Sequence, residues 1–324
     1  MVAALNLPVP ACELCAVYSA TSARDDAGSG WLFTVAEQFV SANTEQLNGR
    51  VFIGPTFFTR AYVNSSYTHL VPSYNFSSRL GLSLNAPLIH RDFRRTESIP
   101  RESLIDESGS LTGFGDVALI GRLSLYQKVE MKRAININLL AGVKLPTGDT
   151  ARLDAEVDAV RQHQDRFPEP GLQHVTIGGV HQHELSLGSG SFDGVFGLTS
   201  TFRWKRFFLN NQIQYYLRTE ARGYEFGDLI IVSGGPAAYL LLNDSYSLSL
   251  QANTFYETSA RDKILGQTFD QTGMTVWYFG PILTLTAGEH FSANAGVEIP
   301  LHIANNGLQT VPDYRIRGGF TWRF

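Results

Sequence analysis

Hydrophobic and polar residues alternate along most of the chain, and the last segment, YRIRGGFTWRF (314–324), shows the alternation most clearly. In an extended backbone its aromatic and aliphatic side chains share one face, whereas Arg315, Arg317 and Arg323 share the other. A period of two residues predicts a β-strand. This strand has one apolar face and one cationic face.

The same period of two recurs in earlier segments, which polar or turn-forming stretches separate. These segments are 31–40, 61–71, 78–89, 115–126, 134–146, 192–204, 207–218, 229–241, 246–257, 275–286 and 291–302. Glu37 interrupts the apolar face of the first of them. Together with the terminal segment, the pattern predicts an all-β fold of about 12 antiparallel strands.

The links between these strands alternate between short turns and long loops. KR at 205–206 and AGEH at 287–290 are short, whereas the polar stretches at about 92–113 and 147–191 are long. Bacterial outer-membrane barrels have short periplasmic turns and longer extracellular loops. An aromatic last strand that ends on phenylalanine is also typical of these barrels, and the barrel-assembly machinery recognises it. We therefore expect a transmembrane up-and-down β-barrel over residues 31–324, with 92–113 and 147–191 as extracellular loops.

Composition limits the alternatives. A mean hydropathy of −0.07 also suits a soluble protein, but only alternate residues of a membrane barrel face lipid. No run approaches the roughly 20 apolar residues of a membrane-spanning helix. The formal net charge of −4 argues against nucleic-acid binding. A soluble all-β protein stays an alternative, because MVAALNLPVPA at the start lacks the basic residues of a signal peptide.

Residues 1–30 differ from the rest of the chain and are interpreted as a periplasmic leader. Cys12 and Cys15 form a C-x-x-C motif in this leader. Because Ala16 follows in place of histidine, the motif is not a haem-attachment site. A disulfide is expected in the oxidising periplasm. A redox or copper site facing a periplasmic partner, and lipidation of Cys12, are the alternatives.

Four further segments carry a family resemblance. They are GFGDVALIGRLSLY (113–126), GVKLPTGDT (142–150), GSGSFDGVFGL (188–198) and RGYEFGD (222–228). In combination they resemble the transporter-like family named for the MetA pathway of phenol degradation. The resemblance extends over residues 31–324, and many members of the family are also similar to this chain in having a cysteine-rich leader before the first strand. It implies an outer-membrane transport barrel, and the family name implies uptake of small aromatic compounds.

Charged residues on the polar faces of the strands are the candidate pore lining. They are Arg79, Asp116, Arg122, Lys144, Arg203, Arg218, Glu257, Glu298, Arg315, Arg317 and Arg323. Rings of charged side chains select solutes in channels. The alternative is that these charges pair with one another and fill the lumen, since a barrel of about 12 strands lies between small filled barrels and wide porins.

Histidines and serines suggest two weaker sites. His181 and His183 share one face of the strand-like segment HVTIGGVHQHELSL, and two imidazoles at this spacing can bind one zinc or copper ion. No firm carboxylate spacing accompanies them, so a solvated loop is the simpler interpretation and no metal is predicted. His69 lies close in sequence to Ser65, Ser66 and Ser73, as a barrel-embedded hydrolase would need.

We therefore expect a non-enzymatic outer-membrane channel that passes a small solute, with aromatic or apolar compounds implied by the resemblance. Its expected partners are outer-membrane lipid, the solute and the barrel-assembly machinery, and no cofactor or nucleic acid is expected. The first alternative is an accessory barrel that docks a periplasmic redox or metal-handling partner through Cys12 and Cys15. The second is the hydrolase.

Overall fold

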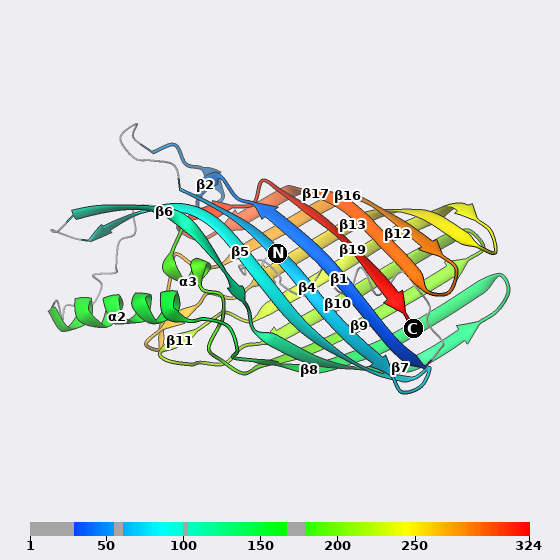
Figure 1. Ribbon diagram of the computed structural model, residues 1–324. Helices are drawn as coiled ribbons and strands as arrows, with labels where there is room; N and C mark the ends of the chain where they lie inside the picture. The colour runs from blue at the N-terminus through cyan, green and yellow to red at the C-terminus, as the bar shows by residue number, and fades with distance from the viewer. Residues whose placement is uncertain (1–28, 55–60, 100–102, 167–178) are drawn as a thin grey trace, which may run out of the picture.

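A computed structural model describes residues 29–54, 61–99, 103–166 and 179–324 and shows one closed, antiparallel β-barrel (Figure 1). Its 12 strands are, in order around the barrel, β4 (Tyr62–Asn75), β1 (Gly30–Ser41), β19 (Tyr314–Arg323), β17 (Phe291–Asn305), β16 (Met274–Ala287), β13 (Tyr246–Ser259), β12 (Leu229–Leu242), β10 (Phe207–Leu217), β9 (Asp193–Trp204), β8 (Arg133–Leu145), β7 (Val117–Val129) and β5 (Leu80–Ile99). Pairing of β4 with β5 closes the ring. The barrel and the strand number predicted from the sequence are confirmed.

The first and last strands of the barrel are neighbours. β1 and β19 pair from Leu32 opposite Arg323 to Ser41 opposite Tyr314. The amide of Phe324 also donates to the carbonyl of Trp31 at 3.1 Å. Because every barrel strand therefore pairs on both sides, no backbone edge is left to meet lipid.

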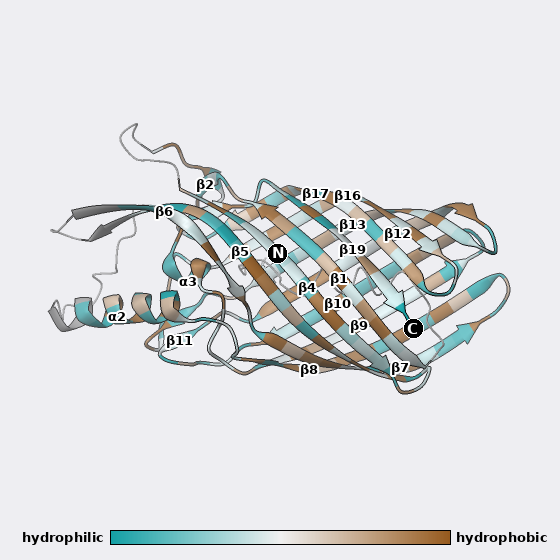
Figure 2. Cartoon of the chain, viewed as in Figure 1, coloured by the Kyte–Doolittle hydropathy of each residue, from teal (hydrophilic) through white to brown (hydrophobic). Residues whose placement is uncertain are grey.

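Alternation decides which side chains face outward. Figure 2 shows apolar and polar residues following one another along the strands. Exposed aromatic residues form a girdle at the end of the barrel with the short turns: Trp31, Phe76, Tyr126, Trp204, Phe207, Tyr246 and Trp322. A second group lies near the end with the long loops: Phe114, Phe192, Phe196, Tyr256, Trp277 and Tyr314. Aliphatic residues cover the strands between them, which is the exterior expected of a barrel in a bilayer.

Glu37 is a carboxylate on this outward side. It lies between the outward residues Val35 and Phe39 of β1 and accepts hydrogen bonds from the hydroxyls of Ser66 and Thr68 on β4. Thr68 Oγ1 is 2.5 Å from Glu37 Oε2. Neighbouring hydroxyls thus satisfy the residue that interrupts the sequence pattern, and β1 continues through it.

The prediction of a loop at 92–113 is wrong in its secondary structure. β5 runs on from the barrel wall, and β6 (Ser103–Phe114) pairs with it from Leu88 opposite Phe114 to Ile99 opposite Ser103. In Figure 1 this hairpin projects past the long-loop end. Cross-strand ion pairs such as Arg94–Asp106, at 2.8 Å, support it. Charged residues interrupt the apolar positions of this hairpin, so its sequence shows no continuous apolar face.

The segment at 147–191 contains helices where the sequence suggested a loop and a strand-like stretch. α2 (Ala151–Arg166) and α3 (Gln182–Leu185) lie at the long-loop end with a small sheet of β11 (Tyr224–Glu225), β14 (Lys263–Ile264) and β15 (Gln267–Thr268). We call the described part of 146–192, with loops 218–228 and 260–273, the cap. Leu153 and Val157 of α2 pack with Tyr224, Ile264 and Phe269 in a hydrophobic core of its own.

A second small sheet at the same end joins β18 (Leu308–Val311), β2 (Thr44–Leu47) and β3 (Arg50–Val51). The amide of Thr310 donates to the carbonyl of Gly179 at 2.7 Å, so this sheet contacts the segment that leads into α3. Among the described residues, no helix is both long and apolar enough to cross a bilayer.

Candidate functional site

A buried charge network occupies the lumen where β17 and β19 pair. Glu298 lies opposite Arg315 and accepts from its Nε at 2.8 Å. Arg317 Nη2 donates to the other oxygen of Glu298 at 2.8 Å, and Asn253 Nδ2 donates to that oxygen at 2.7 Å. All four residues are buried. Buried charges persist only when they are paired in this way, so the network is a fixed part of the interior.

Two aromatic rings complete the surroundings of Arg315. Its guanidinium carbon lies 3.8 Å from the ring centroid of Phe255 and 4.4 Å from that of Tyr278. Glu257 Oε2 lies 3.8 Å from Arg315 Nη1. A cation held over two ring faces gains electrostatic stabilisation away from water. The structure thus brings together Glu257, Glu298, Arg315 and Arg317, four of the predicted pore-lining residues.

A second network joins three of the segments that carry the family resemblance. Asp116 accepts from Lys144 Nζ at 3.0 Å, from the amide of Gly148 at 3.0 Å and from the amide of Ser189 at 2.8 Å. Lys144 Nζ also lies 2.8 Å from Asp193 Oδ2. We call this set the loop junction, because it fastens the segments around 148 and 189 to the barrel wall.

Close backbone packing at the loop junction requires glycine. A Cβ on Gly188 would lie 2.6 Å from the carbonyl carbon and oxygen of Gly148, closer than real Cβ contacts come. The glycines of KLPTGD and GSGSFD therefore permit the two loops to cross in contact. This close packing is a physical reason for the glycines in two segments that, in the sequence, carry only a family resemblance.

The remaining candidates are dispersed. Arg122 points inward and donates to Asn75 at 3.1 Å. Arg79 is exposed in the short turn before β5, and Arg203 and Arg323 are partly buried near the short-turn ends of β9 and β19. Arg218 follows β10 at the opposite end. The network around Glu298 and the loop junction therefore do not extend to these five residues.

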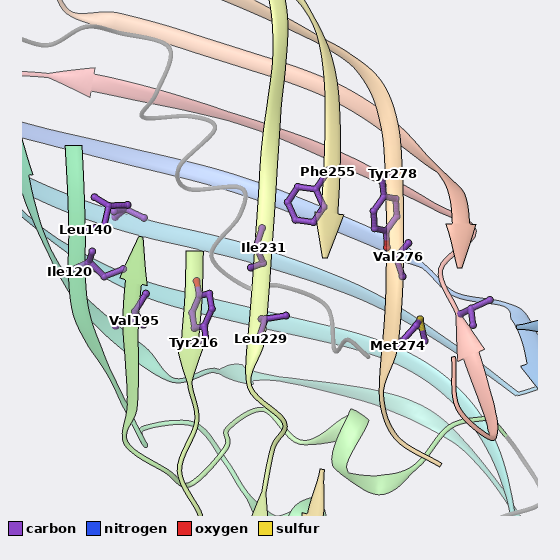
Figure 3. Close-up of a cluster of buried hydrophobic side chains, with 13 residues drawn as sticks. Ile120, Leu140, Val195, Tyr216, Leu229, Ile231, Phe255, Met274, Val276 and Tyr278 are labelled. Carbon is purple, nitrogen blue, oxygen red and sulfur yellow. The ribbon is translucent and has the colours of Figure 1, made fainter. Parts of the chain in front are cut away.

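An apolar wall inside the barrel was not predicted from the sequence. Figure 3 shows a single cluster of buried apolar side chains; apart from Val71 and Val311, its members come from the seven consecutive strands that run from β7 to β16 in sheet order. Its labelled members are Ile120, Leu140, Val195, Tyr216, Leu229, Ile231, Phe255, Met274, Val276 and Tyr278. They occupy inward positions, and all are buried. An aliphatic residue between inward polar residues, such as Ile120 before Arg122, is the sequence signal that could have revealed the wall.

A cavity of about 180 Å³ lies in the long-loop half of the lumen, between the cap and the apolar wall. The wall contributes Tyr216, Leu229, Met274, Val276 and Tyr278 to its lining. Charged lining residues come from the strands, the loop junction and the cap: Arg91, Asp116, Lys144, His183, Glu184, Arg218, Glu257 and Asp262. The cavity therefore presents an apolar side and charged groups to the same space.

A buried ion pair connects α2 and α3 at the top of this cavity. His183 Nδ1 lies 3.0 Å from Glu156 Oε2, and the His183 amide donates to the same oxygen at 2.6 Å. Burial by itself lowers the pKa of His183, but the charge of Glu156 outweighs it and raises this pKa to about 9. Burial raises the pKa of the neighbouring Glu184 to about 7. The His183–Glu156 pair is thus ionised over the physiological range.

We expect the cap to loosen as the pH rises. A histidine whose folded pKa is raised stabilises the fold fully below its unfolded value of 6.5, and this stabilisation is lost as the pH passes about 9. The raised pKa of Glu184 acts in the same direction, because it favours the protonated carboxyl in the folded cap. Limited proteolysis within 147–191 should therefore accelerate between pH 7 and pH 10, after correction for protease activity. In His183→Gln the step near pH 9 should be absent, and an unchanged step would contradict the assignment.

In the described part of the chain, the structure supports neither a metal site at His181 and His183 nor a hydrolase site at His69. The rings of His181 and His183 stack with centroids 5.3 Å apart, on and beside α3 rather than along a strand. Within the described ranges, no group of three or more metal-ligating residues comes together. Cys12 and Cys15 lie outside the described residues, so the leader and its disulfide stay predictions.

His69 does not meet the serines near it in sequence. Its Nδ1 lies 3.0 Å from Asn85 Oδ1 inside the barrel. Ser66 lies on the outward face of β4, and Ser73 Oγ donates to another serine on β5. Ser65 shares the inward face but lies roughly 13 Å along the strand, at about 3.3 Å per residue. The serine–histidine dyad of the hydrolase hypothesis is not formed by these residues.

Comparison with known proteins supports the fold. The chain is similar to the crystal structure of the COG4313 outer-membrane channel from Pseudomonas putida F1, with a TM-score of 0.58, 12% identity, and coverage of 92% of this chain and 96% of that chain. The translocator domain of the autotransporter NalP from Neisseria meningitidis matches with a TM-score of 0.44, 10% identity, and 94% and 92% coverage. The CymD monoaromatic hydrocarbon channel matches with a TM-score of 0.38, 7% identity, and 99% and 95% coverage.

The likeness to the Pseudomonas channel concerns the fold. No protein-family model and no curated protein matches the chain. The closed 12-stranded sheet, the apolar exterior with its aromatic girdles and the likeness to the Pseudomonas channel nevertheless agree with one another. The chain is a β-barrel of the bacterial outer membrane.

Proposed function

We propose that the barrel passes a small aromatic or apolar solute across the outer membrane through its lumen. The observation that carries this proposal is the apolar wall beside the cavity, where Leu229, Ile231 and Val276 are each at most 2% exposed on inward positions. The interiors of water-filled porins are polar. An apolar wall inside a barrel instead favours an apolar ligand, because the ligand can contact it without desolvating polar groups, as it would have to in a polar lumen.

The route follows from the orientation typical of such barrels. Short turns face the periplasm and long loops face outward, so the cap lies on the extracellular side and the cavity beneath it. A solute that passes the cap reaches the apolar wall first. Glu257 and Tyr278, which line the cavity, also contact the network around Arg315. These charges would orient a polar substituent of the solute as it moves toward the periplasm.

Planar-bilayer recording with phenol as the probe tests this proposal. The purified barrel is inserted into an asymmetric lipopolysaccharide–phospholipid bilayer, and phenol is added on the lipopolysaccharide side. We expect discrete conductance steps that phenol interrupts briefly while it occupies the lumen. Folded, heat-modifiable protein that gives no steps, or steps that phenol leaves unchanged, would contradict passage of an aromatic solute.

Polar isosteres in the wall should weaken this interaction with phenol. The double substitution Val195→Thr with Val276→Thr keeps side-chain volume but places two hydroxyls in the wall, so we expect phenol interruptions to become several-fold less frequent. The matched control is Val232→Thr with Val297→Thr, because these valines face outward on β12 and β17 and are 41% and 44% exposed. Equal effects in both double variants would mean that the wall does not contact the solute.

A further inference from the structure

The cavity contains a buried cation that has no carboxylate of the described residues within ion-pair distance. Arg91 of β5 lines the cavity and is 7% exposed. Its Nη2 lies 3.5 Å from the hydroxyl of Tyr67, at the limit of a hydrogen bond. Its Nε has no hydrogen-bond partner within the described part of the chain. A guanidinium in such surroundings is costly unless an anion compensates it.

The other cations of the cavity are engaged in other contacts. Lys144 pairs with Asp116 and Asp193, and His183 pairs with Glu156. The guanidinium of Arg218 lies over the ring of Phe226, 5.5 Å from its centroid; its Nε, like that of Arg91, has no hydrogen-bond partner among the described residues, but its side chain is only partly buried. Arg91 therefore differs from Arg218 in its deep burial, and from Lys144 and His183 in having no ion-pair partner within the described residues.

The acidic residues that line the cavity also have partners. Asp262 accepts from the hydroxyl of Tyr224 at 2.5 Å and from the amide of Gly227 at 2.8 Å. Glu184 accepts from the amide of His181 at 2.9 Å, and burial raises its pKa to about 7 against the opposing charges of His183 and Arg91, so this carboxyl is only partly ionised near pH 7. Arg91 thus keeps donors for an anion that comes from outside the chain.

We propose that the solute is a small aromatic acid, whose carboxylate Arg91 binds while its ring rests on the apolar wall. The wall residues Tyr216, Leu229 and Val276 line the same cavity as Arg91. A guanidinium presents two parallel N–H donors that match a carboxylate. The volume of about 180 Å³ suits one ring, since an engineered apolar cavity of roughly 150 Å³ in another protein binds benzene. This inference rests on the proposed function and specifies its substrate class.

Binding of benzoate and of its neutral isostere benzamide to the refolded full chain in detergent tests the inference. By titration calorimetry at pH 7, the natural chain should bind benzoate at least tenfold more tightly than benzamide. Arg91→Gln should lower benzoate affinity at least tenfold and change benzamide affinity less than twofold. Arg91→Lys, which keeps the charge but loses the paired donors, should have a benzoate affinity between those of the natural chain and Arg91→Gln. The matched control Arg79→Gln removes an exposed arginine of the short turn and should bind benzoate normally.

Three outcomes would overturn the inference. They are equal affinities of the natural chain for benzoate and benzamide, benzoate binding that survives both Arg91 substitutions, and acetate binding as tight as benzoate, which would exclude a role for the ring. If Arg91→Gln does not show the heat-modifiable migration of a folded barrel, Arg91→Lys decides the result. Because binding in detergent needs no passage, benzoate that binds without any effect on current would overturn the proposed function alone.

Discussion

Glu298→Gln is expected to lower the free energy of unfolding of the barrel by about 3–5 kcal/mol, the typical cost of breaking a buried ion pair from one side. Glutamine keeps the shape of the side chain but removes the charge that compensates Arg315 and Arg317. Those arginines are 1% and 3% exposed, so water cannot replace the lost partner. One oxygen of Glu298 accepts hydrogen bonds from both Arg317 and Asn253, and glutamine can satisfy these two donors only partly.

Urea unfolding followed by the heat-modifiable gel shift measures this change. The control is Glu220→Gln, the same substitution at an exposed position in the loop after β10, which should leave the midpoint within experimental error. If Glu298→Gln unfolds at the urea concentration of the natural chain, the two arginines must find other compensation. The network would then be a hydrated pore lining rather than a fixed part of the interior.

The strands could be predicted because lipid and lumen impose opposite demands on alternate residues. Segment 134–146 places Ile135, Leu139 and Val143 outward and Asn136, Asn138 and Lys144 inward, and this contrast marks β8 without knowledge of its neighbours. The terminal strand could be predicted for the same reason. Even at Glu37, where the pattern fails, two neighbouring hydroxyls restore the regular strand.

Polar structure outside the bilayer lacks this contrast. The β5–β6 hairpin carries charged residues beside apolar ones such as Phe93 and Leu111, and its pairing includes cross-strand contacts such as Arg94–Asp106 that only the fold reveals. The sequence of α2 does contain a helical signal: Leu153, Val157 and Val160 recur at helical spacing and pack into the core of the cap. The polar residues around them obscured this pattern.

The candidate site was predictable as a set of residue types but not as a set of partners. Glu257, Glu298, Arg315 and Arg317 are inward as expected, yet inward positions on neighbouring strands do not specify which charges meet. Asn253 was not proposed because a neutral amide on a polar face is unremarkable in sequence. The apolar wall was not predicted because its residues lie between charged ones on the inward faces, and the charges dominate the pattern of those faces.

Asp116→Asn is expected to detach the cap from the barrel and to raise single-channel conductance several-fold. Asp116 is 2% exposed and receives two amides, a hydroxyl and the ammonium of Lys144. Asparagine replaces one acceptor oxygen with an NH₂ group that faces these donors. The loops around Gly148 and Ser189 then lose the acceptor that holds them together, and burial of an unmatched donor adds to the cost.

Asp158→Asn is the matched control, because Asp158 belongs to the same cap but is 62% exposed in a surface pair with Arg161. Such pairs contribute little to stability, so conductance should not change. Limited proteolysis gives an independent measurement: Asp116→Asn should be cut faster within 147–191 while the barrel keeps its heat-modifiable migration. If conductance and proteolysis both stay at the natural level, the His183–Glu156 pair and the hydrophobic core of the cap must hold it in place without the loop junction. Access to the cavity would then depend on the pH-sensitive contacts of α3 rather than on the loops that cross at Gly148 and Gly188.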